Sequence, residues 1–167
     1  MLPQALPQLQ HLCLRGFSKP TRHVGGDFYD FLQQPSGEWI GVLGDVSGKG
    51  IAASLLSSMF LGCLELLLRS GVAIEDALNR LNEFLLEKSS SSRFVTLFLF
   101  VLDQTGGGAF ISAGHNTAYL LRRATDVIEE LPSNNMLLGA FDFVQYQASP
   151  LQLYQGDVLL VYSDGVT

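Results

Sequence analysis

Residues 94–103, "FVTLFLFVLD", are apolar at almost every position. A strand with one face in water would alternate apolar and polar side chains, so this strand is predicted to be covered on both faces. Other layers of the protein must then lie above and below it. This one stretch therefore favours a layered fold with a buried central strand.

Two amphipathic helices are predicted upstream of that strand. Apolar residues recur at three- and four-residue spacing from Ile51 onward, and Gly71 suits the C-terminal cap of this first helix. A second helix is predicted over residues 74–88. The predicted apolar face of the first helix comprises Ala52, Leu55, Leu56, Met59, Phe60, Cys63 and Leu67.

Further strands are predicted on both sides of the helices. They cover residues 28–32, 39–43, 109–115, 117–123, 144–153 and 157–165. We expect 117–123 to pair with the strand that precedes it. Helices that sit together among hairpin-linked strands do not show the alternation of a doubly wound fold, so the predicted class is α+β with mostly antiparallel sheet.

Composition limits the classes of partner. The chain has 167 residues, 47% of them hydrophobic, which suits one globular domain. Its 10 basic and 16 acidic residues give a formal charge of −6, which disfavours nucleic acid or an anionic membrane as the main partner. We identify no signal pattern and no apolar run long enough to span a bilayer, so a cytoplasmic location is expected. The two cysteines, Cys13 and Cys63, are expected to be buried thiols in a reducing compartment.

Four aspartates stand out by their positions. Asp27 and Asp30 occur in "VGGDFYD", Asp45 in "VLGDVSGKG" and Asp164 in "VYSDG". The last two are each expected to follow an apolar strand directly, where side chains can converge. Mg²⁺ and Mn²⁺ prefer oxygen ligands, and the main-chain carbonyl of Val46 could add one. The alternative is that these aspartates are ordinary turn residues or helix caps.

Lys49 and His115 are weaker candidates. "GDVSGKG" suggests a phosphate-binding loop, but it is one residue short of that motif and Gly50 stands where Ser or Thr is needed. Nucleotide binding is therefore disfavoured, although Lys49 could meet a substrate phosphate. His115 in "SAGHN" follows a predicted strand and is interpreted as a structural residue or a contact of the active site.

Several motifs together resemble one family. "VGGDFYDF", "GDVSGKGIAAS", "FVTLFLFVLD", "SAGHNTAYLL" and "GDVLLVYSDGVT" occur in the order found in PPM-type metal-dependent serine/threonine phosphatases, in the bacterial branch named after stage II sporulation protein E (SpoIIE). The resemblance implies an α-β-β-α sandwich of two mostly antiparallel sheets with flanking helices.

The resemblance also implies roles for the candidate residues. Asp45 would bridge two Mn²⁺ or Mg²⁺ ions, the Val46 carbonyl would bind one, and Asp164 would be a further ligand. Asp27 would hold a metal or its water, with Asp30 close behind it. Asp27, Asp45 and Asp164 would then support hydrolysis of a phosphoserine or phosphothreonine by metal-activated water, without a protein nucleophile.

The same resemblance suggests how the chain is organised. Residues 1–23 would be a lead-in from an upstream linker, and 24–167 a phosphatase domain that lacks the family's later segment and its further aspartate. A sensory or receiver domain would precede it in cis. The substrate would be a phosphorylated regulatory protein such as an anti-sigma-factor antagonist, and a homodimer is left open. The alternative is a non-catalytic binding module with the same fold.

Overall fold

The computed structural model describes residues 13–18, 25–34, 36–88 and 93–166. Most of the predicted lead-in segment 1–23 therefore lies outside the described residues. The elements are β1 (Phe28–Gln33), β2 (Trp39–Val46), α1 (Ile51–Arg69), α2 (Ile74–Lys88), β3 (Val95–Leu102), β4 (Gly107–Ala113), β5 (Ala118–Arg122), β6 (Val127–Leu131), β7 (Ser149–Gln152), β8 (Val158–Leu160) and the 3₁₀ turn η1 (Asp164–Val166).

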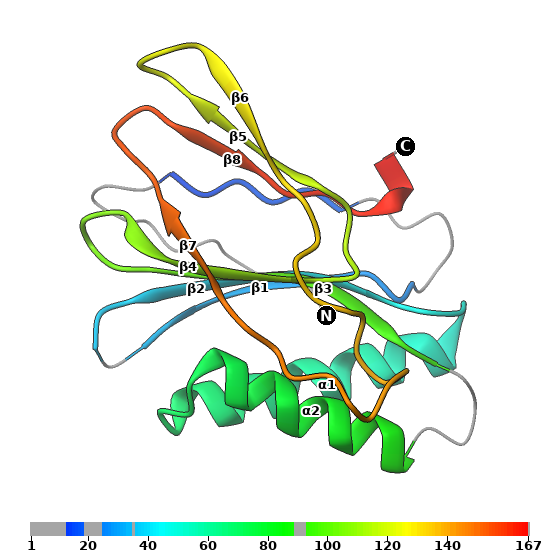
Figure 1. The fold of residues 1–167 in the computed structure, drawn as a ribbon. Helices are drawn as coiled ribbons and strands as arrows, with labels where there is room; N and C mark the ends of the chain where they lie inside the picture. Colours follow the sequence, from blue (N-terminus) through cyan, green and yellow to red (C-terminus); the bar gives the residue numbers. More distant parts are fainter. Residues whose placement is uncertain (1–12, 19–24, 35, 89–92, 167) are drawn as a thin grey trace.

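Two antiparallel sheets face each other. The larger has the strand order β1-β2-β3-β4-β7, and the smaller has the order β6-β5-β8. Figure 1 shows both helices below the larger sheet and the smaller sheet above it. The predicted α+β fold with two antiparallel sheets and helices packed outside is confirmed, with both described α-helices on the same side.

Strand β3 is covered on both faces, as its sequence predicts. It lies at the centre of the larger sheet, between β2 and β4. Leu97 and Leu99 belong to the core that includes the helices, whereas Phe98 and Phe100 belong to the core between the sheets. The uninterrupted apolar run thus supplies alternate side chains to two separate cores.

Helix α1 ends as predicted but buries a different face. Gly71 has a left-handed φ of 78°, and the amide of Val72 donates to the carbonyl of Leu67 at 3.2 Å, which closes the helix end. The buried residues are Ala53, Ser57, Phe60, Leu61, Leu64 and Leu68. Leu55 and Met59, expected in the core, are 66% and 40% exposed. Residues 51–64 contain no charged side chain, so apolar periodicity could not select the face.

Two further expectations need correction: that no apolar run is long enough to span a bilayer, and that both cysteines are buried. Among the described residues, α1 is the one helix that is long and apolar enough, by length and composition alone, to cross a membrane. The core helix of a soluble protein passes the same test. Here α1 packs against the larger sheet, where the rings of Phe60 and Phe28 lie 5.6 Å apart. Cys13 is exposed and Cys63 is partly buried, so the prediction of two buried thiols is wrong for Cys13.

The strands differ from prediction after β4. Strand β5 does not pair with β4; it lies in the smaller sheet between β6 and β8. Strand β6 was not predicted, because "VIEEL" is exposed at four of its five positions and has no clear alternation. The strands predicted at 144–153 and 157–165 shorten to β7 and β8, since only short parts of them find a pairing partner.

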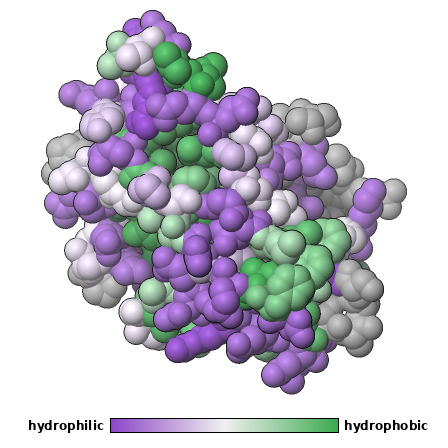
Figure 2. All heavy atoms as spheres, viewed as in Figure 1, coloured by the Kyte–Doolittle hydropathy of each residue, from purple (hydrophilic) through white to green (hydrophobic). Residues whose placement is uncertain are grey.

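The connection between β6 and β7 crosses α2. The buried side chain of Asn82 donates to the carbonyl of Phe141 at 2.9 Å and accepts from the amide of Gly139 at 2.8 Å. Figure 2 shows an apolar patch where this connection crosses the helices, and the exposed apolar residues of the connection are Met136, Phe141 and Phe143. The two hydrogen bonds of Asn82 therefore satisfy partly buried backbone groups in a segment that lacks regular structure.

Candidate metal centre

Asp45 and Asp27 come together at one end of the larger sheet. Asp45 is the second-last residue of β2 and lies opposite Thr96 of β3, so the strand continues through it and does not end before it as expected. Asp27 directly precedes β1, and the backbone amide of Val46 donates to the carbonyl of Gly26 at 3.4 Å. Antiparallel pairing of β1 with β2 therefore places the two aspartates on neighbouring strands.

Asp164 approaches from the smaller sheet. It lies in η1, four residues beyond the end of β8, and so does not follow that strand directly. The hydroxyl of Ser163 donates to Oδ2 of Asp27 at 3.3 Å, which joins this segment to the start of β1. The third carboxylate is thus brought to the other two by contact between the sheets and not by strand pairing.

The electrostatics of Asp45 show that the three carboxylates interact. Partial burial, the neighbouring carboxylate of Asp27 and the charge of Asp164, in that order of importance, together raise the pKa of Asp45 to about 7. Like charges that share a partly desolvated site make ionisation costly, and a bound cation would relieve that cost. A divalent cation at this site would therefore favour the ionised form of Asp45.

Gly26 keeps the space around these oxygen atoms open. A Cβ atom at this position would clash with the carbonyl oxygen of Val46 and lie 2.7 Å from Oδ1 of Asp45. Only glycine lets the backbone approach so closely. The carboxylates and the Val46 carbonyl are hard oxygen donors, which suits Mg²⁺ or Mn²⁺. Within the described part of the chain, however, no group of three or more His, Cys, Asp or Glu side chains is placed so that it could hold a metal ion as it stands.

Asp30 lies apart from this cluster. It is in β1 opposite Val42, and one of its carboxylate oxygens accepts from the amide of Phe31 at 2.8 Å. Burial raises the pKa of Asp30, and the charges that act on it include those of Glu65 and Arg69, near the C-terminal end of α1. The structure therefore brings Asp27, Asp45 and Asp164 together but leaves Asp30 on the helix side of the sheet.

Lys49 lies in the loop that leads from β2 into α1. Gly48 and Gly50 on either side of it have left-handed φ angles of 104° and 81°, a conformation that other residues rarely adopt. Lys49 itself is exposed. Gly44, the first glycine of the supposed phosphate-binding motif, lies inside β2 and pairs with Phe28, so it cannot form part of a loop around a nucleotide.

His115 is buried next to the carboxylates. It is 6% exposed, and its Nδ1 lies 3.2 Å from the hydroxyl of Thr96, the residue opposite Asp45. Its Nε2 has no hydrogen-bond partner among the described residues. Burial lowers the pKa of His115, although the Tyr162 backbone and the charges of Asp27 and Asp164 act in the opposite direction.

Several residues that shape the site were missed in the sequence. Ser57 of α1 donates to the carbonyl of Gly26 at 2.6 Å, Ser163 contacts Asp27, and Thr96 contacts His115. The serines of α1 were visible as polar positions in an otherwise apolar helix. Nothing in the sequence pattern marked Thr96 or Ser163.

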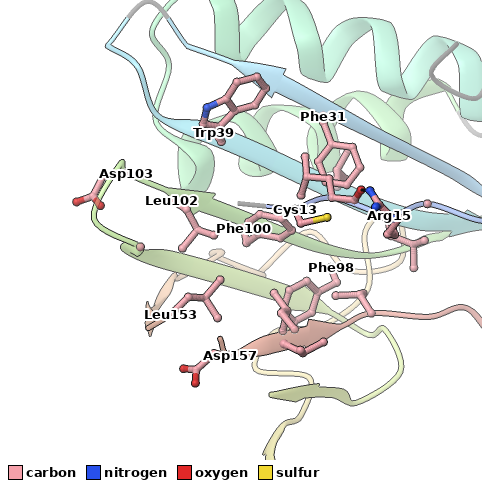
Figure 3. Close-up of a pocket in the computed structure, with 18 of the residues that line it drawn as sticks. Cys13, Arg15, Phe31, Trp39, Phe98, Phe100, Leu102, Asp103, Leu153 and Asp157 are labelled. Carbon is pink, nitrogen blue, oxygen red and sulfur yellow. Dashed lines mark hydrogen bonds between the residues drawn. The ribbon is translucent and has the colours of Figure 1, made fainter. Parts of the chain in front are cut away.

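A separate groove lies between the two sheets. It has a volume of about 1070 Å³ and is lined by aromatic side chains that include Phe31, Trp39, Phe98 and Phe100 (Figure 3). None of the candidate metal ligands lines it. The groove is therefore distinct from the carboxylate cluster.

The sequence is similar to one family of proteins and to individual proteins named for it or for phosphatase activity. The sequence profile of the family Stage II sporulation protein E (SpoIIE) matches residues 35–167. Phosphoserine phosphatase RsbU of Bacillus subtilis (strain 168) is 28% identical over 100% of this chain and 50% of its own length. Stage II sporulation protein E of the same strain is 25% identical over 86% of this chain and 17% of its own length. The chain thus spans half or less of these relatives.

Solved structures support the fold. A Mycobacterium tuberculosis protein with RsbU and RsbW domains has a TM-score of 0.75 at 25% identity, over 89% of this chain and 41% of that one. The PP2C phosphatase domain of SpoIIE from Bacillus subtilis, solved with a fragment of its regulatory domain, has a TM-score of 0.74 at 25% identity, over 84% of this chain and 42% of that one.

Proposed function

The chain belongs to the Stage II sporulation protein E (SpoIIE) family, and from that premise we propose that it forms part of a metal-dependent protein serine/threonine phosphatase. The proposed domain covers residues 24–167, with a lead-in segment before it. The reaction would be hydrolysis of a phosphoserine or phosphothreonine monoester on a regulatory protein. A cytoplasmic location belongs to the same proposal.

The interaction of three carboxylates at one site carries this proposal. Asp27, Asp45 and Asp164 come from three different segments of the chain, yet the charges of Asp27 and Asp164 add to burial in raising the pKa of Asp45. Turn residues and helix caps have no need to share a site. A cluster of this kind, next to a glycine that leaves its oxygens uncovered, supports a cation site.

The residues that would hold Mn²⁺ or Mg²⁺ are Asp27, Asp45 and Asp164, with the carbonyl oxygen of Val46. When bound, such ions polarise phosphoryl oxygens and activate water for attack on phosphorus. The donors are all oxygen atoms, which favours these hard cations over softer ones.

The remaining residues would orient the site and the substrate. The hydroxyl of Ser163 donates to Asp27 and so limits the movement of that carboxylate. The exposed ammonium group of Lys49, on the loop that follows Asp45, could attract a phosphate dianion. Burial lowers the pKa of His115, and its ring contacts Thr96, the residue opposite Asp45, which suits a role in support of the site.

The proposed substrate is a small phosphorylated regulator, such as an anti-sigma-factor antagonist, and an upstream sensory or receiver domain would control the activity. One similar protein is named phosphoserine phosphatase RsbU, which supports a phosphoserine substrate class for this chain. The net charge of −6 also argues against nucleic acid as the partner.

A calorimetric Mn²⁺ titration tests the proposal directly. The wild-type chain is compared with Asp45→Asn and with a matched control, Asp142→Asn, which changes an exposed aspartate in the β6–β7 connection. Binding is expected in the wild type and the control and is expected to disappear in Asp45→Asn. Equal binding by all three proteins would refute the assignment of the metal site.

Turnover of a phosphoserine peptide in Mn²⁺ then separates enzyme from binding module. Hydrolysis that depends on Asp45 supports the phosphatase. Peptide binding without release of phosphate, in a longer chain that contains any further ligand, would favour the non-catalytic alternative.

A further inference from the structure

Two serines of α1 are bonded to the backbone that leads into Asp27. The hydroxyl of Ser54 donates to the carbonyl of Gly25 at 2.7 Å, and that of Ser57 donates to the carbonyl of Gly26 at 2.6 Å. These residues are 29 and 31 positions apart in the chain. Ser57 is 1% exposed, so water does not compete for its hydroxyl.

The hydroxyl of Ser57 bonds mainly to the backbone before Asp27 and not to its own helix. Its oxygen also lies 3.0 Å from the carbonyl of Ala53, the usual partner of a serine inside a helix. A hydroxyl has one proton to donate, and the contact with Gly26 is shorter by 0.4 Å. The carbonyl of Gly26 is therefore the main acceptor.

Gly26 sits where a small movement would change the carboxylate cluster. Its carbonyl accepts from two donors, the hydroxyl of Ser57 on α1 and the amide of Val46 on β2 at 3.4 Å. Asp27 is the next residue in the chain. The two bonds together fix the position of the backbone at Asp27 relative to Asp45 on β2.

The two bonds to the carbonyl of Gly26 differ in length, so they resist separation of the strand ends unequally. The longer bond from Val46 would resist this movement weakly when it acts alone. A strong second bond on the same carbonyl would hold the segment in place.

We propose that Ser57 is a positioning residue that holds Asp27 and Asp45 at the spacing needed to share a metal ion. The inference rests on the proposed function, because it assigns Ser57 a role in the same metal site. It predicts that loss of one hydroxyl on α1 weakens metal binding although Ser57 is not among the proposed ligands.

The test compares Ser57→Ala with Ser58→Ala in the same chain. Ser58 makes a matched control because its hydroxyl donates within the helix, to the carbonyl of Ser54 at 2.9 Å, and the residue is exposed. Alanine is well tolerated in a helix, so both variants are expected to fold. Mn²⁺ affinity is measured by calorimetry, and amide hydrogen exchange of Val46 is measured without metal, since that amide reports on the position of Gly26.

We expect Ser57→Ala to weaken Mn²⁺ binding by roughly 3- to 10-fold, the range that loss of one buried hydrogen bond gives, and to speed exchange at Val46. Ser58→Ala should change neither. If Ser57→Ala and Ser58→Ala have the same Val46 exchange rate and the same Mn²⁺ affinity, the inference is overturned. Faster exchange in Ser57→Ala with unchanged Mn²⁺ affinity would also overturn it, because the hydrogen bond would then be structural only.

The wild type and Asp45→Asn separate this result from failure of the proposed function. If the wild type binds no Mn²⁺, or if Asp45→Asn binds it equally well, the metal site itself is refuted and the inference about Ser57 fails with it. If the wild type binds and Asp45→Asn does not, the behaviour of Ser57→Ala decides the inference alone.

Discussion

Replacement of Asp45 by asparagine should stabilise the metal-free protein while it removes metal binding. The folded-state pKa of Asp45 is about 7, compared with 3.8 for an isolated aspartate. The folded state therefore holds this proton more tightly than the unfolded state does. It follows that stability is lost as the pH rises from about 4 through 7.

The size of the effect follows from the pKa change. A rise from 3.8 to about 7 corresponds to about 4 kcal/mol, because each tenfold change in proton affinity is worth about 1.4 kcal/mol. Asp45 is only partly buried, so water and salt screen much of this. We therefore expect Asp45→Asn to be more stable than the wild type by about 1–2 kcal/mol at pH 8, with the difference shrinking toward pH 5.

Urea unfolding in the presence of a chelator measures both proteins at pH 5 and pH 8. The same experiment at saturating Mn²⁺ should reverse the order, because a ligand that binds only the folded state stabilises it, by about 2.7 kcal/mol at one hundred times its dissociation constant. Parallel pH dependence in the two proteins would refute the reasoning about shared charge. Equal stabilisation of both by Mn²⁺ would refute the role of Asp45 in binding.

Three further outcomes are expected. Gly26→Ala should lower the free energy of unfolding by about 1–3 kcal/mol and abolish Mn²⁺ binding, since its Cβ would meet Val46 and Asp45; unfolding curves and calorimetry that match the wild type would contradict this. The imidazole of His115 should titrate below 6.5 in NMR spectra, so the stability that depends on its burial falls as the pH drops below 6.5, and an ordinary value would show that it is open to solvent. Leu64→Ala should cost about 2–5 kcal/mol in urea unfolding, because α1 buries this side chain completely; a cost below 1 kcal/mol would mean that the helix packs differently.

Some of the candidate metal centre could be predicted from local sequence. Asp27 and Asp45 stand next to glycines, and carboxylates beside flexible turns are recognisable in a single chain. Asp164 was expected to converge with them from its place after an apolar strand, but the contact between two sheets that brings it there could not be derived from the residues alone. The hydroxyls of Ser57 and Ser163 could not be assigned either, because their acceptors are 31 and 136 positions away.

The errors in the fold have related causes. The pairing of β5 with β4 was expected because they are consecutive, but packing placed β5 in the other sheet. The exposed strand β6 gave no signal because its side chains contribute little to a core. Apolar residues surround the first turns of α1, so several faces satisfied the helical period equally well.

The sequence by itself determined the elements whose causes are local: the helix pair, the cap at Gly71, the doubly covered strand β3 and the class of the fold. Backbone preferences and periodicity act over a few residues, which makes them readable in the chain. The tertiary structure alone decided which face of α1 is buried, which sheet receives β5, and which polar groups converge around Asp45. Those outcomes depend on contacts between segments far apart in sequence, where packing and charge are balanced over the whole molecule.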